Sequence, residues 1–152
     1  MTTTAYKRPE SVLVLVHTGA GEVLLLRRRQ PEDFWQEDFW QSVTGSLEAD
    51  EDPAQAARRE LFEETGLAAS GLIDCRISNR FPILPAWRAR YAPEVSHNLE
   101  HVFRIALAGR SAIRLDPAEH LEYRWLDAPS AAALVGSQTN RTAIQTLIQA
   151  AQ

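Results

Sequence analysis

Three glutamates near the middle of the chain have a spacing that suits metal-dependent chemistry. Glu60 lies three residues before Glu63 and four before Glu64, so on a helix that turns by about 100° per residue the three share one face. Like charges crowded in this way are unfavourable unless something compensates. A hard divalent cation such as Mg²⁺ or Mn²⁺ is the natural partner, because it prefers carboxylate oxygens, keeps bound waters and bridges phosphate oxygens. The spacing therefore predicts a metal site that acts on a phosphorylated ligand.

The helix that must carry these glutamates has clear ends in the sequence. Asp52 is a good N-cap, Pro53 fits the first helical position, and Gly66 fits the C-cap. Small and aliphatic side chains form a stripe beside the acidic face, which suits close packing against a sheet: Ala54, Ala57 and Leu61. One helix thus serves both the core and the site.

The remaining pattern predicts a mixed sheet. Residues 11–17 and 22–28 are apolar, strand-like runs joined by Thr-Gly-Ala-Gly, which predicts a hairpin. Further strands are expected over residues 72–78, 101–107 and 122–126. The segment 79–98 contains three prolines and is expected to be a loop.

The C-terminal part of the chain predicts two helices. They are written as "DAPSAAALV" and "SQTNRTAIQTLIQAAQ", the last with a cap expected near Thr139 or Asn140. No linker or long repeat divides the chain. We therefore expect one α/β domain over residues 1–152, with helices flanking the sheet.

Composition excludes several classes of function. The net charge of −4 gives no general attraction to nucleic acid or to an anionic membrane. The longest apolar runs are too short to span a bilayer. The lone Cys75 and a polar N-terminus without a signal-peptide pattern predict a reducing, cytoplasmic location. Oligomeric state is left open.

The glutamates belong to a longer pattern, Gly45-x5-Glu51-x7-Arg59-Glu60-Leu61-x-Glu63-Glu64-x-Gly66-Leu67. This pattern resembles the box of the Nudix hydrolases, which cleave a nucleoside diphosphate linked to another group. The resemblance implies an α/β/α sandwich with a loop-helix-loop metal site, in which a water attacks a phosphorus atom.

The same resemblance assigns roles within the box. Glu60, Glu63 and Glu64 would be the metal-binding and catalytic set, with Glu60 or a neighbour as the base. Arg59 is expected to pair with Glu51 and fix the loop. Gly45 and Gly66 are expected to be structural, at a tight turn and at the helix end.

Outside the box, segments such as "FWQSVTGSLE", "RYAPEVSHNLEHVF" and "AEHLEYRWLDAPSAAAL" resemble one branch of the family, the bacterial dihydroneopterin triphosphate pyrophosphatases. The implied reaction removes pyrophosphate from a pterin triphosphate and leaves the monophosphate. The resemblance places substrate contacts at Lys7, Arg28, Thr44, Phe81, Pro82, Ile83, Leu84 and Ser137. Pro82 departs from the branch's wording and removes an amide donor.

A late acidic residue is expected to add a metal ligand. Glu119 stands where the branch places such a residue, just ahead of a strand, and Glu100 is the alternative. The four histidines have no metal-ligand spacing with one another, so no role is assigned to them.

The pentapeptide Glu-Asp-Phe-Trp-Gln occurs twice in succession before Ser42. The second copy is in register with the box, so the first is interpreted as a duplication that lengthens a surface loop. The alternative is an aromatic clamp in which Trp35 or Trp40 stacks on the pterin.

Two other functions remain open at this stage. One is a Nudix pyrophosphohydrolase whose substrate is a nucleoside triphosphate such as dATP or an oxidised nucleotide. The other is a Nudix module that binds a nucleotide without cleaving it. The presence of all three box glutamates argues against the second.

Overall fold

The computed structural model describes residues 6–30 and 39–151, and its centre is one mixed sheet. Its strands are β1 (Glu10–Thr18), β2 (Glu22–Arg28), β3 (Phe39–Gln41), β4 (Val43–Ser46), β5 (Ile73–Pro82), β6 (His97–Leu107) and β7 (His120–Asp127). The order is β3-β2-β1-β6-β5, with β4 paired to β1 and β7 paired to β2. Only the β1–β6 pairing is parallel among these strands. The predicted mixed sheet and the hairpin of β1 and β2 are confirmed.

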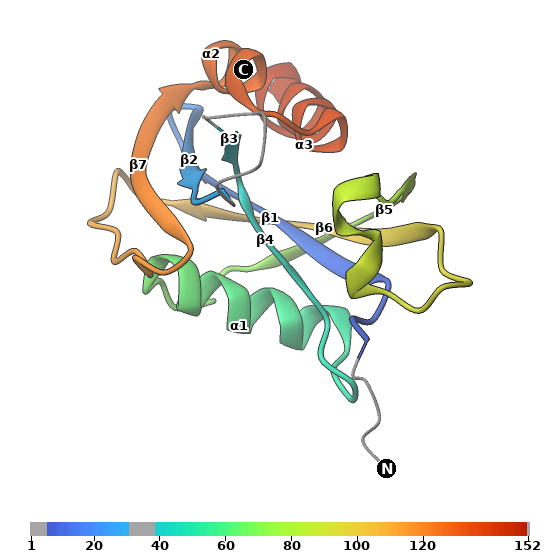
Figure 1. Ribbon diagram of the computed structural model, residues 1–152. Helices are drawn as coiled ribbons and strands as arrows, with labels where there is room; N and C mark the ends of the chain where they lie inside the picture. The colour runs from blue at the N-terminus through green and yellow to red at the C-terminus, as the bar shows by residue number, and fades with distance from the viewer. Residues whose placement is uncertain (1–5, 31–38, 152) are drawn as a thin grey trace.

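Helices cover both faces of the sheet (Figure 1). They are α1 (Pro53–Thr65), the 3₁₀ helix η1 (Pro85–Arg90), α2 (Ala128–Leu134) and α3 (Gln138–Ala143), which continues as η2 (Ile144–Ile148) and η3 (Gln149–Ala151). One face is covered by α1, and the other by α2, α3 and η2. The α/β/α sandwich expected from the resemblance is confirmed. In the described residues, no helix is long and apolar enough to cross a membrane.

The central strand β1 shows why its sequence is a continuous apolar run. Leu13 and Leu15 pack into the core under α2 and η2, whereas Val12 and Val14 pack into the core under α1. Successive side chains of a strand point to opposite faces, so a strand covered on both sides must be apolar throughout. Each face of the sheet therefore packs against its own set of helices.

The ends of α1 are those that the sequence predicts. Asp52 accepts a hydrogen bond from the Gln55 amide at 2.8 Å, and the Gln55 side chain accepts one from the Asp52 amide at 2.9 Å. This reciprocal pair satisfies backbone groups that the first turn leaves open. Gly66 ends the helix with φ +76°, a conformation that glycine adopts without strain.

The prediction of a loop over residues 79–98 is wrong at both ends. β5 continues to Pro82, β6 begins at His97, and η1 lies between them. Pro82 is tolerated because β5 is an edge strand, in which a missing amide donor breaks no pairing with a further strand.

The expected cap of the last helix is also wrong. Ser137 is the N-cap of α3, and its hydroxyl accepts a hydrogen bond from the Asn140 amide. The Asn140 side chain is used elsewhere: it accepts from the Ser42 amide at 2.8 Å and donates to the Ser42 hydroxyl at 2.9 Å. The Asn140 side chain therefore makes a long-range contact with Ser42 instead of capping the helix.

The second copy of the duplicated pentapeptide supplies β3, and the first copy lies outside the described residues. Trp40 is only 4% exposed and packs in the core beside α2. The Arg124 guanidinium lies over its ring at 4.7 Å from the centroid. Trp40 is thus a core residue, and the hypothesis that it stacks on a substrate is wrong. The same hypothesis for Trp35 lies outside the described residues.

Candidate active site

The box glutamates differ in exposure although they share one helix. Glu60 and Glu64 are buried against the sheet, with Glu64 only 1% exposed, whereas Glu63 lies at the surface. Both carboxylate oxygens of Glu64 are buried and make no hydrogen bond to any residue that the structure describes. Glu119 and His120 each offer a ligand atom, and these atoms and one of Glu64 all lie within 4.8 Å of one another. The helix and a distant loop therefore meet at Glu64.

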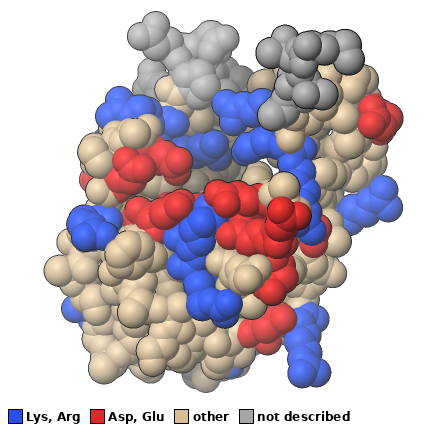
Figure 2. All heavy atoms as spheres, turned by 90° about the horizontal axis from the view of Figure 1, so that it is seen from below, with Lys and Arg blue, Asp and Glu red and all other residues tan. Residues whose placement is uncertain are grey.

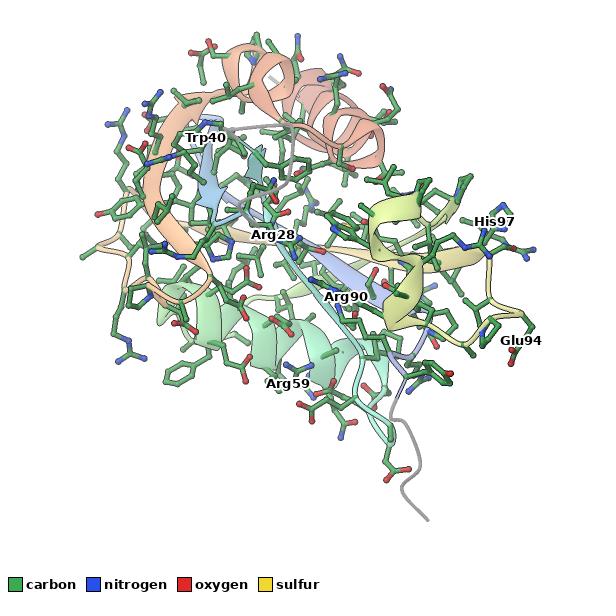
Figure 3. All side chains as sticks on the ribbon, viewed as in Figure 1. Arg28, Trp40, Arg59, Arg90, Glu94 and His97 are labelled. Atoms are coloured by element: carbon green, nitrogen blue, oxygen red, sulfur yellow. The ribbon has the colours of Figure 1, made fainter. Side chains whose placement is uncertain are left out.

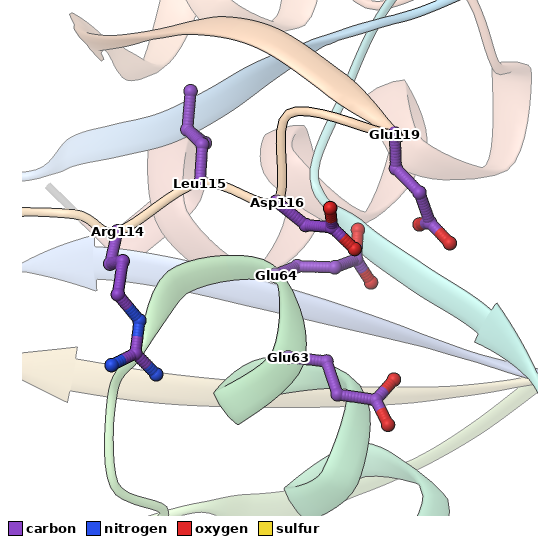
Figure 4. Close-up of a pocket in the computed structure, with 6 residues that line it drawn as sticks. All are labelled: Glu63, Glu64, Arg114, Leu115, Asp116 and Glu119. Atoms are coloured by element: carbon purple, nitrogen blue, oxygen red, sulfur yellow. The ribbon is translucent and has the colours of Figure 1, made fainter.

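A cavity of about 260 Å³ opens at this meeting point. It is lined by Glu63, Glu64, Arg114, Leu115, Asp116 and Glu119. Figure 4 shows Glu63 and Glu64 on α1, with the Glu64 side chain beside Asp116 and Glu119 on the segment between β6 and β7. Seen from below, acidic side chains gather in the middle of the molecule with Lys and Arg side chains beside them (Figure 2).

The loop ahead of β7 is fixed by backbone bonds to two elements. The amide of Arg114 donates to the carbonyl of Thr65 at 2.9 Å, and the amide of Arg29 donates to the carbonyl of Glu119 at 2.7 Å. Asp116 forms the turn itself, since its carbonyl accepts from the amides of Glu119 and His120. These bonds hold Glu119 against the end of α1, although it is far from the box in sequence.

The electrostatics of the buried pair fit a divalent cation. Burial raises the pKa of Glu64 well above its usual value, and the neighbouring charge of Glu60 raises it further. Burial also raises the pKa of Glu60. Two neighbouring buried carboxylates, one of them with unpartnered oxygens, are costly on their own, and a bound cation would remove both the repulsion and the unmet bonds. Among the described residues, the group that could hold such a cation is Glu64, Glu119 and His120. Metal binding by Glu60, Glu63, Glu64 and Glu119 stays a prediction.

Arg59 pairs with Glu51 as predicted. Its Nε and Nη2 atoms donate to the two Glu51 oxygens at 2.7 Å each, and Nη2 also donates to the carbonyl of Ser46 at 3.0 Å. Nη1 donates to Glu60 at 2.7 Å, a contact that the sequence did not predict. The pKa of Arg59 is raised, chiefly by the bonds to Glu51. Arg59 thus ties the loop before α1 to a metal-site carboxylate.

Gly45 is required for a different reason from the one predicted. Its φ is not positive, so it makes no left-handed turn. A Cβ atom placed on Gly45 would instead overlap the carboxyl group of Glu60. The glycine therefore lets a buried carboxylate lie directly against the backbone of β4.

Three cations lie near the carboxylates of the site. They are the side chains of Lys7, Arg28 and Arg90. The pKa of Lys7 is lowered by burial and then by the charges of Arg90 and Arg28, while Glu60 and Glu119 act in the opposite direction. Arg28 lies over the ring of Trp87 at 5.2 Å from the centroid. Arg28 and Arg90 are seen above α1, and Arg59 lies along α1 itself (Figure 3). Cations that repel one another in this way are stabilised by an anion between them.

His120 is a site residue that the sequence analysis missed. Its Nε2 atom lies 3.4 Å from Glu64 Oε1 and 3.4 Å from Gln41 Nε2. Burial lowers its pKa to about 4, so the ring is neutral near pH 7. The four histidines have no metal-ligand spacing with one another, but His120 directly follows Glu119, and that position was the available signal. Asp116 was likewise not predicted.

The alternative late ligand, Glu100, is not in this group. It lies on β6 opposite Ser11, on the face of the sheet covered by α3 rather than α1. Glu119 therefore takes the place beside Glu64, although the binding of a metal to it remains a prediction.

The other predicted substrate residues do not meet the carboxylates. Thr44 donates to the carbonyl of Val12, and Ser137 caps α3. Near the end of β5, Phe81 is half-buried and lies opposite Asn98 of β6. After β5, Ile83 is buried and Leu84 is exposed. Only Lys7 and Arg28 of the predicted contacts lie at the carboxylates. Thr44, Phe81 and Ser137 border the opposite face of the sheet.

Comparisons with known proteins agree with this geometry. The Nudix domain model matches residues 7–147. The dihydroneopterin triphosphate diphosphatase of Escherichia coli K12 is 45% identical over 148 residues, which cover 94% of each chain. The enzyme of that name from Haemophilus influenzae is 40% identical, over 92% of this chain and 87% of its own.

A solved structure is similar as well. That of the E. coli dihydroneopterin triphosphate pyrophosphohydrolase has a TM-score of 0.85 at 43% identity, over 97% of this chain and 99% of its own. Since the family model spans nearly the whole chain and relatives match it from end to end, the protein belongs to the Nudix hydrolases.

Proposed function

We propose that this Nudix hydrolase cleaves dihydroneopterin triphosphate to the monophosphate and pyrophosphate. The observation that carries the proposal is a cluster of carboxylates close to a cluster of cations. The carboxylates are those of Glu60, Glu64 and Glu119, and the cations are those of Lys7, Arg28 and Arg90. A triphosphate has both the charge and the length to lie between them. The assignment of a pterin to the other end of the substrate is supported by two relatives, 45% and 40% identical, that are dihydroneopterin triphosphate diphosphatases by name.

Different residues would bind the metal, bind the phosphates and accept the proton of the attacking water. A divalent cation, Mg²⁺ or in its place Mn²⁺, would be held by Glu60, Glu63, Glu64 and Glu119, and when bound it supplies charge neutralisation and a lowered pKa for water. Lys7, Arg28 and Arg90 orient the phosphates and offset charge on the leaving group. Glu60 or a neighbouring glutamate takes the proton of the attacking water. Arg59 keeps the Glu60 carboxylate in place.

Replacing Arg90 tests the cation group. We expect Arg90→Ala to raise KM for the triphosphate about 10-fold, because a charge-assisted bond to a phosphate oxygen is lost. Steady-state kinetics measure this. Arg88→Ala is the matched control, since Arg88 lies in the same 3₁₀ helix and is also exposed. Equal changes in KM for the two variants would remove Arg90 from the phosphate site.

The substrate is tested by kcat/KM in parallel assays with Mg²⁺ on dihydroneopterin triphosphate, dATP and 8-oxo-dGTP, with identification of the released products. We expect the pterin substrate to lead by more than about 10-fold, which corresponds to roughly 1.4 kcal/mol in transition-state binding. If a nucleotide leads, the alternative Nudix pyrophosphohydrolase is correct. If no pyrophosphate is released from any of them, the binding module is correct.

The setting of the reaction is part of the proposal. We infer one domain over residues 1–152 that works on a small triphosphate in the cytoplasm, without a nucleic-acid or membrane partner. A net charge of −4 and a single cysteine support this.

A further inference from the structure

A second buried carboxylate lies on the face of the sheet that the metal site does not use. Glu100 of β6 is 5% exposed. Its neighbours in register are Asn79 of β5 and Ser11 of β1. Val102, the next residue on the same face of β6, packs in the core under α2 and η2. Glu100 therefore lies across the sheet from α1 and takes no part in the metal site.

The groups around Glu100 leave its charge unbalanced. Asn79 donates to it at 3.5 Å, and the Thr139 hydroxyl of α3 also favours its charged form. Both groups are neutral. Burial nevertheless raises the pKa of Glu100, and no ion pair offsets its charge in the part of the chain that the structure describes. Burying a carboxylate without a cation is costly, so such a residue is a candidate for ligand recognition.

A second acceptor lies beside it on the same strand. Asn98, also 5% exposed, donates from Nδ2 to the Ser11 hydroxyl at 2.7 Å. That bond orients the amide and leaves Asn98 Oδ1 buried without a partner. Residues 98 and 100 of a strand point to the same side. A buried carboxylate without a cation and a buried acceptor without a donor therefore lie next to each other.

Predicted substrate contacts border this pair. Phe81 opposes Asn98 directly in the register of β5 and β6. The Ser137 hydroxyl lies 3.0 Å from that of Thr139, the neighbour of Glu100. Thr44 opposes Leu13, which is on the same face of β1 as Ser11. Three of the predicted substrate contacts, Thr44, Phe81 and Ser137, therefore lie on the same face as Glu100 and Asn98.

The chemistry of this pair matches one edge of a pterin ring. A 2-amino-4-oxopyrimidine carries a ring N–H next to an exocyclic amino group, which gives two parallel donors. A carboxylate accepts such a pair in the same way that it accepts two N–H groups of a guanidinium. Guanine has the same edge, whereas adenine presents a ring acceptor there that repels a carboxylate.

We propose that Glu100 is the specificity residue that binds the 2-amino-4-oxopyrimidine edge of the substrate, with Asn98 Oδ1 accepting a further N–H. The inference rests on the proposed function, because it names the part of the site that recognises the pterin. The triphosphate then extends from this face, past the end of the sheet, to the cations and the metal-site glutamates.

The test compares Glu100→Gln with Glu94→Gln, an exposed carboxylate in the loop before β6. kcat/KM is measured for dihydroneopterin triphosphate, dGTP and dATP. We expect Glu100→Gln to lower the value for the first two by roughly 10- to 100-fold, as for the loss of a hydrogen bond to a charged group. The value for dATP should stay within about twofold, and Glu94→Gln should match the wild type throughout.

Binding gives a second readout that does not depend on hydrolysis. Neopterin without phosphates is titrated by its fluorescence, and we expect Glu100→Gln to weaken binding by a similar factor. Inorganic triphosphate should inhibit the wild type and the variant equally. Glu100→Asp, which keeps the charge but withdraws it by one methylene group, should show an intermediate loss and remains informative if Glu100→Gln does not fold.

Two results separate the inference from the proposed function. If the Glu100 variants lose activity equally on all three substrates and bind neopterin normally, Glu100 is structural and the inference is wrong. If the wild type itself prefers dATP, the proposed function is wrong whatever the variants do.

Discussion

Glu64→Gln is expected to give a folded protein that has lost nearly all activity. Glu64 is buried among the site carboxylates, and neither of its oxygens makes a hydrogen bond to a described residue. In the proposed reaction, removing its charge removes a metal ligand and a candidate base together. We expect kcat for pyrophosphate release to fall on the order of 10³-fold or more. The measurement is Mg²⁺-dependent pyrophosphate release.

The same variant should be more stable than the wild type when metal is absent. The native-state pKa of Glu64 is raised, so its contribution to stability is present below its ordinary value of 4.5 and is lost as the pH rises through the native pKa. Lowering the pH from neutral towards 4.5 should therefore stabilise the wild type relative to Glu64→Gln. Thermal unfolding in EDTA across this range measures the difference, and Mg²⁺ should raise Tm only for the wild type.

Glu122→Gln is the control for this experiment. Glu122 is a half-buried carboxylate on β7 that pairs with Arg27, away from α1. It should keep wild-type activity and the same rise in Tm with Mg²⁺. Retention of more than about a tenth of the wild-type kcat by Glu64→Gln would show that Glu64 is neither a necessary ligand nor the base.

Gly45→Ala is expected to have the second-largest effect. The new methyl group overlaps the carboxyl group of Glu60, so either that carboxylate or the backbone of β4 must move. A displacement of about 1 Å in a catalytic group costs on the order of 10²-fold in rate. Overpacking should also cost about 1–3 kcal/mol in the free energy of unfolding. Steady-state kinetics and urea unfolding measure the two effects.

Gly19→Ala is the matched control, because a Cβ atom on Gly19 meets nothing within 4 Å. It should leave kcat unchanged and alter the unfolding free energy by less than about 0.5 kcal/mol. Near-normal kcat for Gly45→Ala would mean that Glu60 has room to retreat and that its exact position against β4 is not required.

The parts of the site that the sequence predicts correctly depend on neighbours along the chain. The ends of α1 at Asp52 and Gly66 follow from capping within one turn. The Arg59–Glu51 pair links the loop to the helix that follows it. A short segment contains all the groups that make these contacts, so residue types and spacing are enough to predict them.

The tertiary structure decided what depends on distant strands. It placed Glu119 and His120, rather than Glu100, beside Glu64, because the pairing of β7 with β2 and the bonds of the loop to Thr65 and Arg29 cannot be read from local sequence. It also showed that Gly45 admits a carboxylate instead of making a turn.

The sequence by itself therefore determined the fold class, the helix and its glutamates. Which face of the sheet each remaining polar residue serves was decided only by register, since a shift of one residue moves a strand side chain to the opposite face. That is why Glu100 of β6 lies on the face of the sheet away from α1 and its glutamates.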